Sequence, residues 1–169
     1  MPDKKGRGVS NVPIKIQDVP DTPVVSATDV GASRAYNNGA ATVTLSNPTG
    51  GAPTSWSITT TPSTTTTVAT SSPVTLTGLS SATSYTVSAT ATNNTGVTTS
   101  AGTSSSFTAT TVPQAPTIGS PTVATGQSYT GTASVSVPFT AGATGGSSIT
   151  GYTVTSSSGN TGTGSSSPI

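Results

Sequence analysis

The feature that most constrains the fold of this chain is the alternation of apolar residues with Ser and Thr. The segment Ala41–Leu45 places its apolar side chains on one face and its Thr side chains on the other, and Val74–Leu76 repeats the pattern. Trp56 and Ile58 share a face in the same way, and the longest alternating run is Tyr85–Ala91. A period of two with a hydroxyl outer face indicates half-buried antiparallel strands. Because Thr and Val also favour strands over disorder, we expect residues 22–112 to be ordered.

Turn sequences separate these alternating segments, and no helical period is present. Gly, Asn and Pro, which favour turns, concentrate in Asn37–Gly39, Asn47–Gly51 and Asn93–Gly96. We therefore predict an all-β fold of about seven short antiparallel strands arranged as a β-sandwich. Its expected structural core consists of Val43, Leu45, Trp56, Ile58, Leu76, Leu79, Tyr85 and Val87.

An internal repeat predicts the domain organisation. Four matched segments differ in residue number by 93, 92, 96 and 95: Val19–Pro23 with Val112–Pro116, Gly39–Leu45 with Gly131–Val137, Trp56 with Tyr152, and Ser71–Val74 with Ser166–Ile169. We expect an extended N-terminal arm at 1–21, a β-sandwich at 22–112 and a partial second β-sandwich at 113–169. Half a sandwich leaves an open apolar face. We expect a continuation of the chain to complete it; completion by another chain is the alternative.

Charge is confined to one end of the chain, because every Asp, Lys and Arg lies within the first 34 positions. The net charge is +1, so the chain has no basic field for nucleic acid or an anionic membrane. It contains no Cys and no His, and no apolar run long enough to insert into a membrane. The basic N-terminus has no apolar run behind it, so we expect no secretory signal peptide.

The same composition argues against catalysis and metal binding. From Ala35 onwards the only side chains suited to acid–base work are four Tyr, and no base is available to activate a Ser or Thr hydroxyl. Asp18 and Asp21 could approach a Ca²⁺ ion, but such a site needs six or more oxygens. We therefore expect both side chains to be hydrated residues of a linker. We predict a protein that is not an enzyme and that has no cofactor and no metal.

Two segments resemble glycosylation sites. The Thr-rich run Thr59–Thr67 could carry O-glycans, although a strand that passes through a Pro turn into a short edge strand explains it equally simply. Asn93-Asn94-Thr95 matches the N-glycosylation sequon. Because no secretion signal is expected, we interpret both segments as structural.

The N-terminal arm is the one place where specificity based on charge can reside. An alternating pair of Ile residues follows a basic cluster, and a strand of this pattern could add to the edge of a partner's sheet. A disordered leader is the alternative. The predicted docking residues are Lys4, Lys5, Arg7, Ile14 and Ile16.

The segment Gly78–Asn93 resembles the fibronectin type III signature. Leu79 precedes Tyr85 by six positions, alternating apolar residues follow, and Asn93 stands where the family has Asn. The resemblance implies a tyrosine corner at Tyr85, whose hydroxyl would bind nearby backbone. Residues 145–154 are similar to the third strand of bacterial and viral members. The chain departs from animal members in having Leu45 where they bury a Trp, and in lacking Arg-Gly-Asp, so no adhesion ligand is implied.

The whole pattern resembles bacteriophage virion proteins, which combine a short N-terminal anchor with Thr/Ser/Gly-rich immunoglobulin-like repeats. The resemblance implies a structural virion protein, a fibre-like or decoration appendage whose arm binds capsid, neck or tail proteins. We expect a homo-oligomer in a many-copy assembly, with weak attachment to host surface glycans. One alternative is an extracellular or cell-surface role, as a bacterial adhesin or as an accessory module of a secreted polysaccharide-degrading enzyme. Another is a tail or capsid shell protein without host contact.

Overall fold

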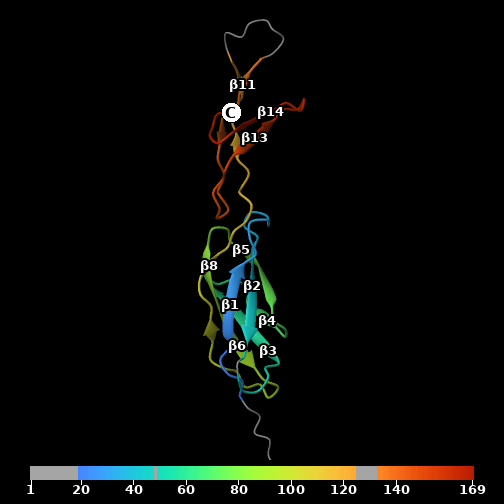
Figure 1. Cartoon of the computed structure of the whole chain (residues 1–169), viewed down its shortest axis with the longest axis vertical. Helices are drawn as coiled ribbons and strands as arrows, with labels where there is room; N and C mark the ends of the chain where they lie inside the picture. The colour runs from blue at the N-terminus through green and yellow to red at the C-terminus, as the bar shows by residue number, and fades with distance from the viewer. Residues whose placement is uncertain (1–18, 48, 125–132) are drawn as a thin grey trace, which may run out of the picture.

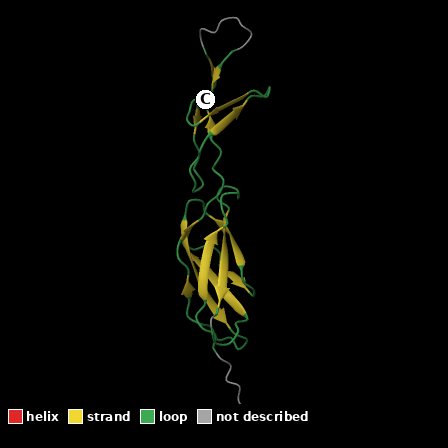
Figure 2. Ribbon diagram, viewed as in Figure 1, coloured by secondary structure: helices red, strands yellow, loops and turns green. Residues whose placement is uncertain are grey.

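The computed structural model describes residues 19–47, 49–124 and 133–169, and these residues form strands and turns with no helix. The strands belong to two successive units along the long axis of the molecule (Figure 1). Loops rather than helices connect them (Figure 2). The all-β antiparallel fold predicted from the alternation is therefore confirmed.

The first unit is a sandwich of two antiparallel sheets. One sheet has the strand order β1-β2-β5, and the other has the order β4-β3-β6-β7, with β8 also pairing with β6. All of the pairings are antiparallel, as expected for short connections. The strands are β1 (Val24–Asp29), β2 (Gly39–Ser46), β3 (Ser55–Thr61), β4 (Thr67–Ala69), β5 (Val74–Leu79), β6 (Ser84–Thr92), β7 (Gly102–Thr103) and β8 (Phe107–Thr108).

The core of the first unit lies between these two sheets. The buried positions of β6 alternate along the strand, because side chains at every second residue face the opposite sheet. Seven of the eight residues expected in the core are buried: Val43, Leu45, Ile58, Leu76, Leu79, Tyr85 and Val87. Trp56 is half-buried, and its Nε1 donates a hydrogen bond of 3.0 Å to Oδ1 of Asn47. Its indole therefore packs at the edge of the core rather than at its centre.

Sequence analysis missed the contribution of β1. Val25 and Ala27 are buried on the inner face of that strand, and Ala109 is fully buried near the end of the unit. The alternation Val25-Ser26-Ala27 was the available signal, although it is short and the next residue on the same face, Asp29, is charged.

A tyrosine corner connects β5 to β6. The ring of Tyr85 is 3% exposed, and its hydroxyl accepts a hydrogen bond of 3.1 Å from the backbone N–H of Ser80. Phe107 stacks beside the ring, with the two ring centroids 6.1 Å apart. The hydrogen bond between Ser80 and Tyr85 holds the turn before β6 against β6 itself, which is a central strand of the larger sheet.

The second unit repeats the strand pairing of the first as far as Ile169. Phe139 pairs with Ile118, as Leu45 pairs with Val25. Ile169 and Val137 exchange backbone hydrogen bonds of 2.6 and 3.1 Å. The strands are β9 (Thr117–Ile118), β10 (Thr122–Val123), β11 (Val135–Ser136), β12 (Phe139–Thr140), β13 (Tyr152–Thr155) and β14 (Thr161–Gly164).

Two further contacts show that the repeat is structural. The Val137–Ile169 bonds lie where the first unit pairs Val43 with Val74. Val137 therefore corresponds to Val43, which is two residues away from the match with Leu45 that the sequence repeat predicted. In the first unit the N–H of Leu45 donates to Ser72 Oγ at 2.8 Å, and in the second the N–H of Phe139 donates to Ser167 Oγ at 2.8 Å. The described residues of the second unit thus have counterparts of the strands up to the start of β5.

Candidate functional site

The charged side chains of the described residues are bound within the first unit. The carboxylate of Asp29 accepts hydrogen bonds from the N–H groups of Gly31 and Thr110, each at 3.1 Å, and one from the hydroxyl of Thr110. Nε of Arg34 donates to the carbonyl oxygen of Asn38 at 2.6 Å. Asp29 therefore joins the end of β1 to the segment that leaves the unit, which is a structural role.

The described residues offer little for metal binding. No group of three or more His, Cys, Asp or Glu side chains gathers among them. Of the two acids considered for Ca²⁺, Asp18 lies outside the described residues, and the carboxylate of Asp21 accepts a hydrogen bond from the hydroxyl of Thr49. None of the described residues form a helix that could cross a membrane.

Asn93 of the sequon has a structural role in the turn after β6. Its Oδ1 accepts hydrogen bonds from the N–H groups of Thr95 and Val97, each at 3.0 Å, and from the hydroxyl of Thr95 at 2.7 Å. The side chain is 5% exposed, and its Nδ2, the atom that would carry a glycan, is buried. The folded unit therefore does not present this amide for modification.

The Thr-rich segment also takes part in the fold. The side chain of Thr60 is buried, and its hydroxyl bonds to the carbonyl oxygen of Pro62 at 2.8 Å and to the N–H of Thr64 at 3.0 Å. The chain then enters β4 at the edge of its sheet. This arrangement matches the alternative to glycosylation given above, a strand that passes through a Pro turn into a short edge strand.

A hydrogen-bonded junction joins the two units. The N–H of Val112 donates to the carbonyl oxygen of Arg34 in the first unit at 2.9 Å. On the other side, the N–H of Thr111 donates to the carbonyl oxygen of Gly145 at 2.8 Å, and the N–H of Gln114 donates to that of Ala143 at 2.9 Å. The connecting segment is thus bonded to both units.

Gly145 allows the close approach at this junction. Its φ is +73°, and a Cβ atom at this position would lie 2.5 Å from the carbonyl oxygen of Val112. Only glycine combines this backbone conformation with the absence of a side chain. Sequence analysis missed the junction, although its two parts were visible as the repeated Val112–Pro116 segment and the adjacent glycines at 145 and 146.

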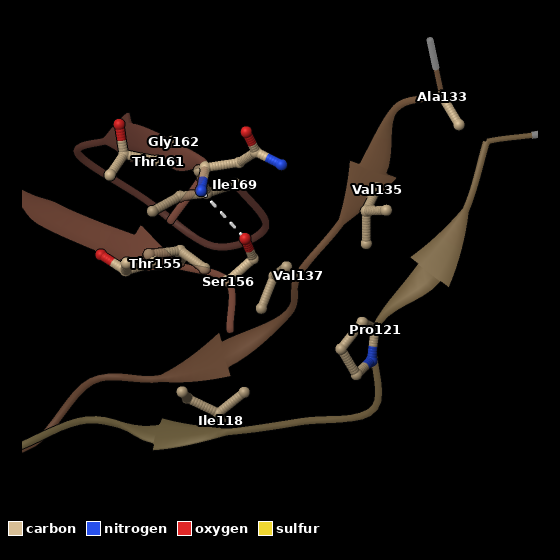
Figure 3. Close-up of a pocket in the computed structure, with 12 residues that line it drawn as sticks. Ile118, Pro121, Ala133, Val135, Val137, Thr155, Ser156, Thr161, Gly162 and Ile169 are labelled. Carbon is tan, nitrogen blue, oxygen red and sulfur yellow. Dashed lines mark hydrogen bonds between the residues drawn. The ribbon is translucent and has the colours of Figure 1, made fainter. Parts of the chain in front are cut away.

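An apolar groove lies between the two layers of the second unit. Its volume is about 790 Å³, and its walls come from strands of both layers. Figure 3 shows Ile118, Val135, Val137 and Ile169 around the same open space, with Thr155 and Thr161 at one side. In the first unit, the corresponding positions lie on the face that is covered.

The predicted docking residues Lys4, Lys5, Arg7, Ile14 and Ile16 all lie outside the described residues. The docking role of the arm therefore stays a prediction. Neither a scan of protein-family models nor a search of curated proteins found a match to this chain.

Proposed function

We propose that this chain is a structural protein of a bacteriophage virion, a fibre-like or decoration appendage in which β-sandwich units act as rigid spacers. The observation that carries the proposal is the junction, because hydrogen bonds from Val112 and Thr111 to both neighbouring units restrict bending between them. A spacer needs this property, whereas an enzyme would need titratable groups gathered in a cleft. The N-terminal arm would bind a capsid, neck or tail protein, and exposed hydroxyls would contact host glycans weakly.

We propose that the units belong to the fibronectin type III superfamily. Two observations support it: the pair of antiparallel sheets packed face to face, and the hydrogen bond from the Ser80 N–H to the Tyr85 hydroxyl. Fold alone says little about function, so the role in the virion depends on the arm and the surface instead.

The uncharged surface favours a many-copy assembly. From Ala35 onwards no side chain carries a formal charge, so neighbouring copies would not repel one another. Ser and Thr hydroxyls keep such a surface hydrated, and they can exchange hydrogen bonds with water for bonds to a neighbour at little net cost. A homo-oligomeric shell or fibre is the arrangement that makes use of both properties.

The proposal is tested on particles. Antibodies raised against residues 22–112 should label discrete positions on purified virions in immunogold electron microscopy. A chain lacking residues 2–18 should lose incorporation, while a chain with Val68→Ala, an exposed change in the sandwich, should be incorporated at the normal copy number. Incorporation of the truncated chain at normal level would refute docking by the arm. Label on cell walls, with none on particles, would favour the adhesin or accessory-module alternative.

A further inference from the structure

Asn38 and Gly39 form an Asn-Gly pair where the loop after β1 enters β2. Asn38 is exposed and ends a tight turn, in which its N–H donates a hydrogen bond of 2.9 Å to the carbonyl oxygen of Ala35. Gly39 is the first residue of β2. The Asn38 side chain is therefore open to water, while a turn holds the main chain before it and a strand holds the main chain after it.

Gly39 leaves its own backbone nitrogen accessible to the side chain of Asn38. A Cβ on the following residue would shield that nitrogen, and glycine also has the freest backbone of all residues. Asn38 is the one Asn of the sequence that is followed by Gly. Asn94 and Asn160 are exposed as well, but each is followed by Thr, whose branched Cβ is bulky and stiff.

Arg34 contacts both carbonyl oxygens of Asn38. Its Nε donates to the main-chain oxygen at 2.6 Å, and its Nη2 donates to Oδ1 at 3.4 Å. A positive charge held beside the side-chain carbonyl stabilises the negative charge that develops on Oδ1 when a nucleophile adds to Cγ. The guanidinium therefore makes this amide more reactive than an amide that only water surrounds.

We propose that Asn38 is a site of spontaneous deamidation through a succinimide. The backbone nitrogen of Gly39 loses its proton to solvent and bonds to Cγ of Asn38, and the side-chain nitrogen takes up a proton and leaves as ammonia. Water then opens the ring. Cleavage between Cγ and the Gly39 nitrogen gives aspartate at position 38, and cleavage between the main-chain carbonyl carbon and that nitrogen gives isoaspartate. The net reaction consumes one water and releases one ammonia.

The reaction would change the junction between the two units, because the carbonyl oxygen of Arg34 accepts the junction bond from the Val112 N–H. Aspartate at position 38 would place a carboxylate beside the Arg34 guanidinium, and charge-assisted bonds are stronger than neutral ones. Isoaspartate would instead add one atom to the main chain, next to the irregular register at Gly39 and Ala40, and would displace the oxygen that Arg34 binds. The inference is independent of the virion assignment, since it depends only on these contacts.

The test follows each Asn of the full native chain during incubation at neutral and at mildly alkaline pH. Mass spectrometry after pepsin digestion locates each conversion, and the acid of that digestion suppresses further reaction. Conversion at Asn38 should accelerate with pH, because the attacking nitrogen must lose a proton. It should be about tenfold faster than at Asn94, which corresponds to an activation free energy lower by about 1.4 kcal/mol. Unchanged Trp56 emission shows that the first unit stays folded throughout.

Two variants test the role of Arg34. Arg34→Gln removes the positive charge and should slow conversion at Asn38, while Arg34→Lys keeps the charge and should retain more of the rate. Conversion at Asn94 serves as the control within each chain and should not change. Equal rates at Asn38 and Asn94 in the native chain would overturn the proposal, and so would an Asn38 rate that Arg34→Gln leaves unchanged or that both variants lower equally. Faster conversion at Asn38 that depends on the charge at position 34 supports it.

Discussion

Replacing Leu79 by Ala tests the core of the first unit most directly. Leu79 is fully buried in a cluster with Ala41, Tyr85 and Ala109. Removal of three carbon atoms costs about 2.4 kcal/mol of transfer free energy at about 0.8 kcal/mol for each buried CH₂ group. The remaining cavity adds to that cost where neighbours cannot move into it.

Little collapse is expected at this site. Ala41 and Ala109 have no side chain long enough to fill the cavity, and the Tyr85 ring is held by its hydroxyl bond to Ser80. We therefore expect Leu79→Ala to lower the free energy of unfolding by about 3 to 4 kcal/mol, in the middle of the range for such changes. Leu79→Met, which nearly conserves volume, should cost less than about 1.5 kcal/mol.

Urea denaturation followed by fluorescence measures this change in one unit only. Trp56 is the single Trp of the chain and lies in β3, so its emission reports the unfolding of the first unit. With a denaturant slope of about 1 kcal/mol per M, the midpoint should fall by about 3 to 4 M. Val68→Ala, at a position that is 70% exposed, should change the free energy by about 0.5 kcal/mol or less. A loss below about 1 kcal/mol for Leu79→Ala would refute the packing described for this cluster.

Two further changes test the corner and the junction. Tyr85→Phe should lower the free energy of unfolding by about 1 kcal/mol, since Ser80 is an exposed residue whose N–H can bind water instead. Tyr36→Phe should leave the Trp fluorescence midpoint unchanged. Gly145→Val should leave that midpoint unchanged but loosen the junction, because its Cβ would meet the Val112 carbonyl oxygen at 2.5 Å. Small-angle X-ray scattering should then show a broader distribution of shapes, and identical scattering of both chains would contradict the rigid junction.

The alternation predicted most of the first unit because each strand buries one face against a single core. Side chains such as Val43, Ile58 and Val87 have a strong preference for the interior, so their positions in the sequence report their positions in the sandwich. The internal repeat predicted a second unit of similar strands, but it matched Val137 with Leu45, whereas the backbone bonds to Ile169 give Val137 the place of Val43. These features depend on local periodicity, which a single sequence displays.

The junction and the role of Asn93 could not be predicted in the same way. The junction depends on backbone atoms of Thr111 and Gly145 that lie 34 positions apart in the sequence, and backbone hydrogen bonds leave no residue-type signature. Asn93 matched a modification motif, yet burial and the three hydrogen bonds to its Oδ1 decide its role. Burial of a polar side chain in a turn follows from tertiary contacts rather than from composition.

The course of the chain through the first unit also determines how the unit would respond to pulling. The chain enters β1 at Val24 and leaves beside its far end, where Thr110 binds Asp29 (Figure 1). Tension between neighbouring units would therefore act along β1, almost at right angles to the six residue pairs that join it to β2. Bonds loaded in this way share the force and fail together, whereas a strand peeled from one end loses them one at a time. An array of such units would resist stretching far better than its modest core suggests.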